Sequence, residues 1–216
     1  MKIKYWGHSC FQLTDEKGRA VVTDPYTGVG YELPEGIRAD IVTVSHGHFD
    51  HNNVAKVRSD CVLFKSGEYD IDGIKIIGLD SWHDPKMGKL RGANVIYKMI
   101  LDGIVVCHLG DLGEAFSWEL VEKIGKVDVL LLPVGGTYTV DAAEAKVYAD
   151  AIAPSTIIPM HYRPSDGALD ILTVEPFLHQ YAKKEVAIVP DGEKEISLDA
   201  LADLTKVIYM ERKKGE

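Results

Sequence analysis

Cysteine is scarce in this sequence. The 216 residues include three, Cys10, Cys61 and Cys107, which lie far apart and form no Cys-X-X-Cys pair. An odd and widely spaced set argues against a disulfide framework, and it lacks the close pairs of a thiolate metal site. Each cysteine lies in an apolar run, so we expect three buried, reduced thiols.

Positive charge is also in short supply. The chain has 24 Lys and Arg residues against 33 Asp and Glu residues, and its formal net charge is −9. A general nucleic-acid or membrane-surface binder needs a basic face, so we expect neither nucleic acid nor a membrane as a partner. A small anionic substrate stays open, because local Lys and Arg side chains can still act in a pocket.

Long apolar runs are absent as well. Runs such as residues 127–134 are far shorter than the roughly 20 residues that span a bilayer. The first residues, Met-Lys-Ile-Lys-Tyr-Trp, contain neither an apolar signal-peptide core nor a small-residue cleavage site. We therefore expect a cytoplasmic protein with a small-molecule substrate. The sequence leaves the oligomeric state open, a homo-oligomer included.

The composition is that of a globular protein, with 46% hydrophobic and 26% charged residues. Without a linker or an internal repeat, residues 1–216 are expected to form one domain. Short apolar runs separated by Gly, Asp, Asn and Pro predict strands in the first half. They lie at residues 3–6, 10–13, 20–23, 41–44, 61–64 and 74–77, and at 95–101 and 104–107 on either side of the hairpin turn Asp102-Gly103.

Helical spacing of apolar residues is clearer in the second half. A helix is expected after the N-cap Ser117, a second after Thr139 or Asp141, and a third near Thr173. Apolar strands are expected between these helices, at residues 129–132, 156–158 and 186–189. Strands first, followed by alternating helices and strands, predict a layered α/β protein.

Metal-competent side chains follow four of the predicted strands. The run 41–44 leads into His46-Gly-His48-Phe-Asp50-His51, and three other runs lead into His83, Asp111 and His161. Ligand sites of α/β proteins collect at such strand ends, where loops converge over one edge of a sheet. We therefore expect these side chains to share one site.

The spacing within residues 46–51 indicates two metal positions. His46 and His48 are two residues apart, so on an extended chain both imidazoles project to one side. Asp50 and His51 come after a turn and point differently, so they can serve a neighbouring position. Imidazole and carboxylate ligands suit zinc, manganese or iron. We expect two divalent metal ions, zinc first among the candidates.

In combination these residues resemble the metallo-β-lactamase superfamily. Its HxHxDH signature is complete at residues 46–51, and Asp24, His83, Asp111 and His161 resemble its other marks in chain order. The likeness extends to about residue 162. The motifs Gly-His-Ser at 7–9 and Cys-His-Leu-Gly-Asp at 107–111 are most similar to the branch of metal-dependent hydrolases related to ascorbate-6-phosphate lactonase and N-acyl-phosphatidylethanolamine phospholipase D.

The resemblance implies a four-layer αβ/βα sandwich with two mixed β-sheets and the site in the cleft between them. It also implies a set of metal ligands: His46, His48 and His83 for one metal, Asp50, His51 and His161 for the other, and Asp111 as the bridge. The implied activity is hydrolysis of a small ester, lactone or phosphodiester by a metal-bridging hydroxide. Asp50 would take up the proton, and Asp24 would orient the ligands.

Several residues near this motif set have two interpretations. His108 competes with His83 for the third histidine of the first metal, and we favour His83 because it begins a long loop. His8 is either a substrate contact or a turn residue. Tyr138 can line the cleft or donate a proton. The basic residues Lys89, Arg91 and Arg163 are either solvated or hold a phosphate or carboxylate of the substrate.

Two other classes of function stay open. One is an iron-dependent redox enzyme related to flavodiiron proteins. These need a flavin-binding domain downstream or a partner, and no segment after residue 163 is long enough for such a domain. The other is a non-catalytic metal-binding module, which the complete ligand set disfavours. A secreted β-lactamase is disfavoured by the lack of an export signal, and an RNase by the charge of −9.

Overall fold

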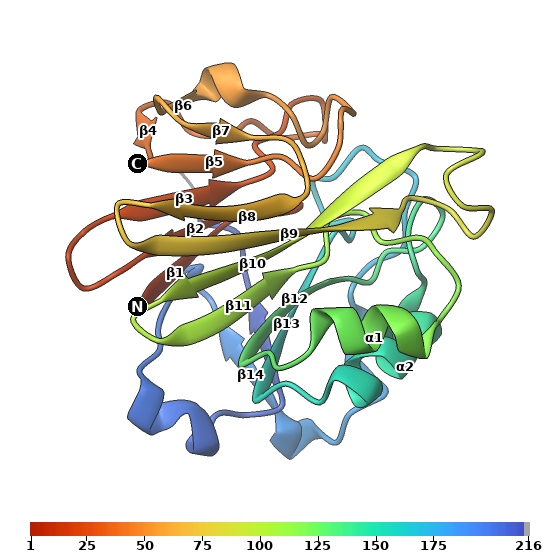
Figure 1. The fold of residues 1–216 in the computed structure, drawn as a ribbon. Coiled ribbons are helices and arrows are strands. Elements are labelled where there is room, and N and C mark those ends of the chain that lie inside the picture. Colours follow the sequence, from red (N-terminus) through yellow and green to blue (C-terminus); the bar gives the residue numbers. More distant parts are fainter. Residues whose placement is uncertain (214–216) are drawn as a thin grey trace.

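The structure, a computed structural model that describes residues 1–213, contains two mixed β-sheets (Figure 1). In spatial order, the six-stranded sheet consists of β15 (Glu193–Glu195), β1 (Lys2–Gly7), β2 (Cys10–Thr14), β3 (Ala20–Thr23), β5 (Ile41–Thr43) and β7 (Val62–Leu63). The eight-stranded sheet consists of β14 (Val186–Val189), β16 (Val207–Met210), β13 (Thr156–Met160), β12 (Val129–Pro133), β11 (Ile104–His108), β10 (Ala93–Leu101), β9 (Ile74–Trp82) and β8 (Gly67–Ile71). A small parallel pair joins β4 (Ile37–Arg38) to β6 (Val57–Arg58).

The two sheets pack on one apolar core. Ile3 of β1 and Val21 of β3 belong to the same buried cluster as Ile96 of β10 and Leu130 of β12. Residues from both sheets are therefore removed from water together, which is the main stabilising contribution of such a sandwich. This arrangement agrees with the two mixed sheets expected from the sequence.

A second apolar cluster lies on the outer face of the six-stranded sheet. Val22 and Val42 alternate with the core-facing residues of β3 and β5, and they pack with Tyr26 and Leu33 of the segment 24–36. Both faces of these strands are buried, which explains why their sequences are continuous apolar runs. In the described part of the chain, loop segments largely form this outer layer.

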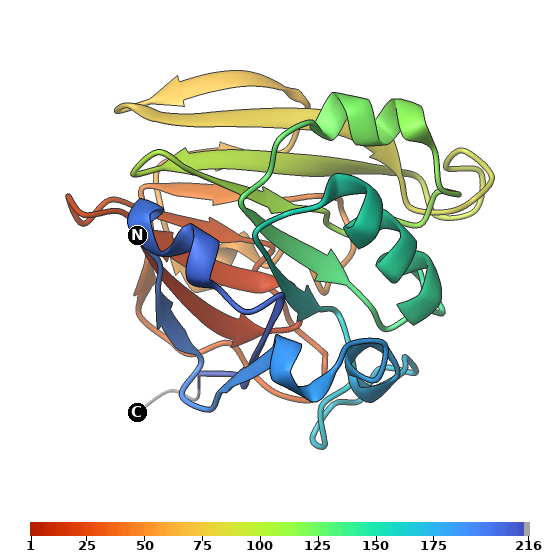
Figure 2. The same cartoon turned by 90° about the horizontal axis from the view of Figure 1, so that it is seen from below.

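Two helices cover the outer face of the eight-stranded sheet. Helix α1 (Trp118–Ile124) contacts β9, and α2 (Ala142–Ile152) contacts β12 (Figure 2). Ser117 caps α1 as predicted, because its Oγ accepts a hydrogen bond from the Leu120 amide at 3.1 Å. Helix α2 begins after Asp141, which decides between the two predicted starts.

The other helical elements are short: α3 (Glu175–Leu178) and the 3₁₀ turns η1 (Val54–Lys56), η2 (Lys183–Glu185) and η3 (Leu198–Asp203). No helix within residues 1–213 is long and apolar enough to cross a membrane. The expectation for the cysteines holds for Cys10 and Cys107, which are buried, whereas Cys61 is only half-buried.

Strand β9 is longer than predicted, and this affects the site. It continues past residue 77 because it pairs with β10 as far as Trp82, opposite Ala93. The sequence hides this extension, since Gly78 is typical of a strand end. At Gly78 a Cβ atom would lie 2.9 Å from the Lys65 carbonyl oxygen, so the close approach of a neighbouring chain requires glycine. His83 therefore follows directly on the strand.

The N-terminal cap of α2 should contribute measurably to stability. The Asp141 carboxylate accepts hydrogen bonds from the Ala143 and Glu144 amides at 2.9 Å, and the Glu144 carboxylate accepts one from the Asp141 amide at 3.0 Å. Asp141→Ala should lower the free energy of unfolding by about 1 kcal/mol, measured by urea denaturation. The control Asp150→Ala removes only an exposed pair with Lys146 and should cost less than about 0.5 kcal/mol. Equal losses would contradict this role for the cap.

Candidate metal centre

Six strands end at one cluster of polar side chains, and they come from both sheets. Within the six-stranded sheet β1, β3 and β5 run in one direction, as do β9, β11 and β13 within the eight-stranded sheet. Their carboxyl ends therefore meet at one edge. The residues that follow them are His8, Asp24, the segment 46–51, His83, Asp111 and His161.

The first group contains His46, His48 and His83, the set that the resemblance implied for one metal. One ring nitrogen of each lies within 4.8 Å of the others. His46 Nε2 lies 3.0 Å from His48 Nδ1. His83 is buried and His48 is exposed, so this group opens toward solvent.

The second group contains Asp50, His51 and His161, and His8 joins them. All four are buried, and their ligand atoms lie within 4.8 Å of one another. His8 Nε2 lies 3.2 Å from Asp50 Oδ2. His8 is buried like the other members of this group, at 1% exposed, and the structure places it beside Asp50. Its contact with the substrate stays a prediction.

Asp111 lies between the two groups. Its Oδ2 is 3.2 Å from His83 Nε2 and 3.2 Å from His161 Nε2, while its Oδ1 is 3.2 Å from His51 Nε2. One carboxylate thus reaches histidines of both groups, which is the position that a bridging ligand needs.

Several buried atoms of the cluster have an oppositely charged neighbour at 3.2 Å but form no hydrogen bond of suitable geometry within residues 1–213. They include His51 Nε2, Asp111 Oδ1 and His161 Nε2. Buried polar atoms are rarely left unpaired. Here they belong to nitrogen and oxygen ligands that lie side by side, so the residues present fit a metal ion.

The electrostatics of the cluster also favour a cation. Burial, aided by the charge of His51, lowers the pKa of His46 to about 3, which keeps its imidazole neutral. Burial raises the pKa of Asp111, but His161 and His51 outweigh it and hold this pKa well below its usual value. Burial lowers the pKa of His51, yet Asp111 and Asp24 raise it well above normal. Positive charge is therefore stabilised beside Asp111.

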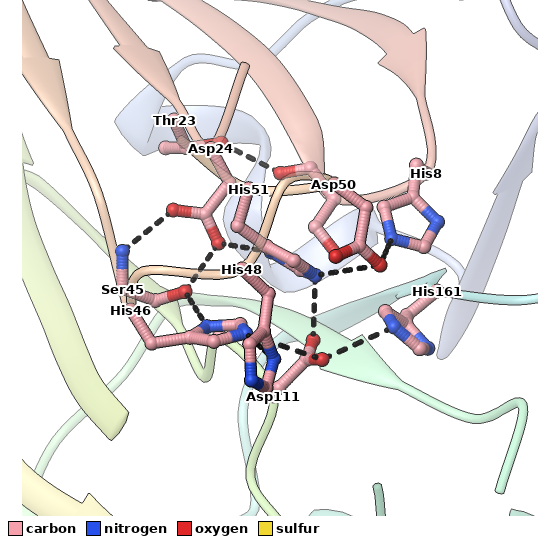
Figure 3. Close-up of polar contacts among 12 residues, drawn as sticks. His8, Thr23, Asp24, Ser45, His46, His48, Asp50, His51, Asp111 and His161 are labelled. Atoms are coloured by element: carbon pink, nitrogen blue, oxygen red, sulfur yellow. Dashed lines mark hydrogen bonds and ion pairs between the residues drawn. The ribbon is translucent and has the colours of Figure 1, made fainter. Parts of the chain in front are cut away.

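Asp24 orients histidines of both groups (Figure 3). Its Oδ2 accepts hydrogen bonds from His51 Nδ1 at 2.8 Å and from Ser45 Oγ at 2.5 Å. Ser45 Oγ lies 2.9 Å from His46 Nδ1. The Ser45 hydroxyl donates its proton in the hydrogen bond to Asp24, so its oxygen accepts a hydrogen bond from the protonated Nδ1 of His46. The Nε2 lone pair of His46 is then left for a metal. Asp24 is thus a positioning residue for the ligands, below the cleft.

His108 has no nitrogen free for a metal. Its Nε2 donates to the Ser9 carbonyl oxygen at 2.8 Å, and its Nδ1 accepts from the Gly110 amide at 3.1 Å. His83, in contrast, directs Nε2 toward Asp111. The geometry therefore favours His83 as the ligand and gives His108 a structural role.

A cavity of about 460 Å³ opens above the cluster. Tyr138 and Arg91, two of the predicted site residues, line it together with His48, Asp50 and Asp111. The other two basic candidates lie elsewhere. Lys89 is exposed outside this cavity, and Arg163 lines a different one, beside Tyr162.

Two supporting residues were missed from the sequence. Ser45 directly precedes the histidine motif, so its position was a usable signal. Asn94 carried no signal, because it comes from β10 and reaches Asp111 only in the folded chain, where its Oδ1 accepts from the Asp111 amide at 2.9 Å. At Gly110 a Cβ atom would lie 2.3 Å from Asn94 Oδ1, so this contact requires glycine.

Comparisons with known proteins agree with this geometry. A family model described as a β-lactamase superfamily domain matches residues 2–161. A UPF0173 metal-dependent hydrolase from Methanoregula boonei is 31% identical over 190 residues, which cover 75% of this chain and 82% of the relative. The chain belongs to this family of metal-dependent hydrolases.

Further members of the superfamily are similar over most of their length. A UPF0173 metal-dependent hydrolase from Thermococcus onnurineus is 28% identical over 75% of this chain and 84% of its own. A Thermotoga maritima structure, classed with the Zn-dependent hydrolases of the metallo-β-lactamase superfamily, matches with a TM-score of 0.79 and 37% identity over 97% of both chains. These matches confirm the expected metallo-β-lactamase-like fold, and the His/Asp cluster of this hydrolase is able to bind metal.

The hydrogen bonds of Asp24 predict how metal affinity responds to substitution. Asp24→Asn should weaken zinc binding by about 10- to 100-fold, because it removes the charged acceptor behind both His51 and Ser45. Ser45→Ala should weaken only the site of His46. Zinc titration against a chromophoric chelator measures both. Asp40→Asn, a substitution outside the site, serves as the control. Unchanged affinity in Asp24→Asn would contradict the positioning role.

Proposed function

We propose that the chain is a binuclear metal-dependent hydrolase of a small ester, lactone or phosphodiester. The observation that carries this proposal is the position of Asp111, within 3.2 Å of histidines from two separate ligand groups. His46, His48 and His83 would hold one divalent metal, and Asp50, His51 and His161 the other. Zinc is our first candidate, and manganese or iron would also suit these nitrogen and oxygen ligands.

Bound metals of this kind lower the pKa of a coordinated water and polarise the scissile bond, which is the chemistry that they would supply here. The protein side chains supply positions and protons. Asp50 lines the cavity, and although burial raises its pKa, His8 and His51 bring the pKa below its usual value. Asp50 is therefore ionised, as a metal ligand must be, and a proton that it receives would be passed on readily. The Tyr138 side chain faces the same cavity and can donate one to a leaving group.

The cavity supports a small-molecule substrate. Its volume of about 460 Å³ lies in the range of small-ligand sites. The net charge of −9 disfavours a nucleic-acid substrate. We accordingly propose a cytoplasmic enzyme with a small-molecule substrate.

Metal-restoration assays test this function. Protein stripped with a chelator should regain hydrolysis of 4-nitrophenyl esters, lactones or bis(4-nitrophenyl) phosphate when zinc or manganese is restored. Asp111→Asn should lower kcat by more than roughly 100-fold, because it removes the shared charged ligand. Asp40→Asn should keep full activity.

The alternatives predict different results. Oxygen consumption by the iron-loaded protein without hydrolysis would indicate a redox enzyme of the flavodiiron type. Tight metal binding without turnover of any of these substrate classes would indicate a non-catalytic module. Hydrolysis that survives complete metal removal would also contradict the proposal.

A further inference from the structure

Hydrogen bonds to Asp84 fix the shape of the loop between β9 and β10, beside the candidate metal centre. This buried carboxylate accepts hydrogen bonds from three backbone amides of its own loop, those of Lys86 at 2.8 Å, Leu90 at 2.9 Å and Arg91 at 2.8 Å. The loop begins at His83, whose amide donates to the Gly92 carbonyl oxygen at 3.1 Å. Leu90 and Arg91 are therefore fixed in position relative to a candidate metal ligand.

Arg91 is a half-buried cation without a carboxylate partner. Within residues 1–213 no Asp or Glu oxygen lies within ion-pair distance of it, whereas Arg19 and Arg212 pair with carboxylates. Its guanidinium carbon lies over the Tyr138 ring, 5.0 Å from the ring centroid, and both residues line the cavity. A cation over an aromatic ring is stabilised there without an ion pair, so the N–H groups of the guanidinium stay available to a ligand.

The wall around Arg91 is apolar. Phe49 and Leu90 line the same cavity although they are 55% and 60% exposed, and Leu169 joins them. Large exposed apolar side chains that gather at a cavity are typical of a binding surface for an apolar group. The cavity thus has three kinds of surface: the cluster of candidate metal ligands, the cationic side chain of Arg91 and an apolar wall.

We infer that Arg91 binds an oxyanion of the substrate, a carboxylate or phosphoryl group, while Phe49, Leu90 and Leu169 bind an apolar group of the same molecule. This inference rests on the proposed hydrolase function and adds the substrate class: small amphiphilic esters, lactones or phosphodiesters with one negative charge near the scissile bond. The planar N–H fork of arginine matches both oxyanions. Because Lys89 and Arg163 lie outside the cavity, Arg91 carries this specificity.

Two esters with the same leaving group test the charge preference. The half-ester 4-nitrophenyl glutarate is anionic, and 4-nitrophenyl valerate is neutral with a similar chain. In metal-loaded Arg91→Met, kcat/KM for the glutarate should fall about 10- to 100-fold, mainly through KM, because a charge-assisted hydrogen bond is lost. The valerate should change less than about threefold. Lys89→Met, on the same loop, should change neither.

An equilibrium measurement separates this inference from the hydrolase proposal. Calorimetric titration of the zinc-loaded protein with phenylphosphonate and with benzoate requires no turnover. In Arg91→Met the Kd of at least one probe should rise about tenfold. In Lys89→Met both Kd values should stay constant. The probe whose Kd rises identifies the oxyanion that Arg91 binds. Metal content and circular dichroism check that each variant is loaded and folded.

Different results would overturn the oxyanion site and the hydrolase function. If neither probe changed its Kd between wild type and Arg91→Met, the oxyanion site would be overturned. An equal loss of kcat/KM for the anionic and the neutral ester would also overturn it. Failure of all hydrolysis with a rise of Kd in Arg91→Met would overturn the proposed function and leave the oxyanion site supported.

Discussion

The Asp111 carboxylate is 2% exposed and lies 3.2 Å from the ring nitrogens of His51, His83 and His161. A buried carboxylate is costly unless positive charge compensates it. Part of this charge comes from His51. Burial lowers the pKa of His51, but Asp111 and Asp24 outweigh burial and hold this pKa well above its usual value. Metal cations would compensate it more completely, and the unpaired nitrogen and oxygen atoms around Asp111 match their ligand preference.

The fold makes this burial possible by distributing the cluster over both sheets. The ligands follow the ends of four strands, β5, β9, β11 and β13, so short connections place them together without a long loop. Hydrogen bonds behind the ligands then set their orientation: Asp24 acts on His51 directly and on His46 through Ser45. The open side of the cluster meets a cavity with one cation, Arg91, and an apolar wall. The position of the ligands, their orientation and the lining of the cavity thus depend on different parts of the chain.

Local chemistry made much of this predictable from the sequence. The histidine spacing at residues 46–51 and the caps at Ser117 and Asp141 depend on neighbours along the chain, and the structure brings the motif residues together in the expected groups. Contacts between distant segments were not predictable. Asn94 supports Asp111 from another strand, and the extension of β9 depends on its pairing with β10.

The basic residues show the same limit. Lys89 and Arg91 are two residues apart, yet only Arg91 lines the cavity, because the Asp84-centred loop determines which side chain turns inward. Arg163 follows His161 closely in sequence but belongs to another cavity. Proximity in sequence to a motif therefore indicated which loops border the site and not which side chains enter it.

The number of metal ions per chain is the direct test of a binuclear site that shares Asp111. Zinc-loaded protein, passed through a desalting column, can be analysed by mass spectrometry for metal content and by anomalous diffraction for metal positions. We predict two zinc ions per chain with the Asp111 carboxylate between them. A single ion, or two ions that do not share Asp111, would contradict this prediction.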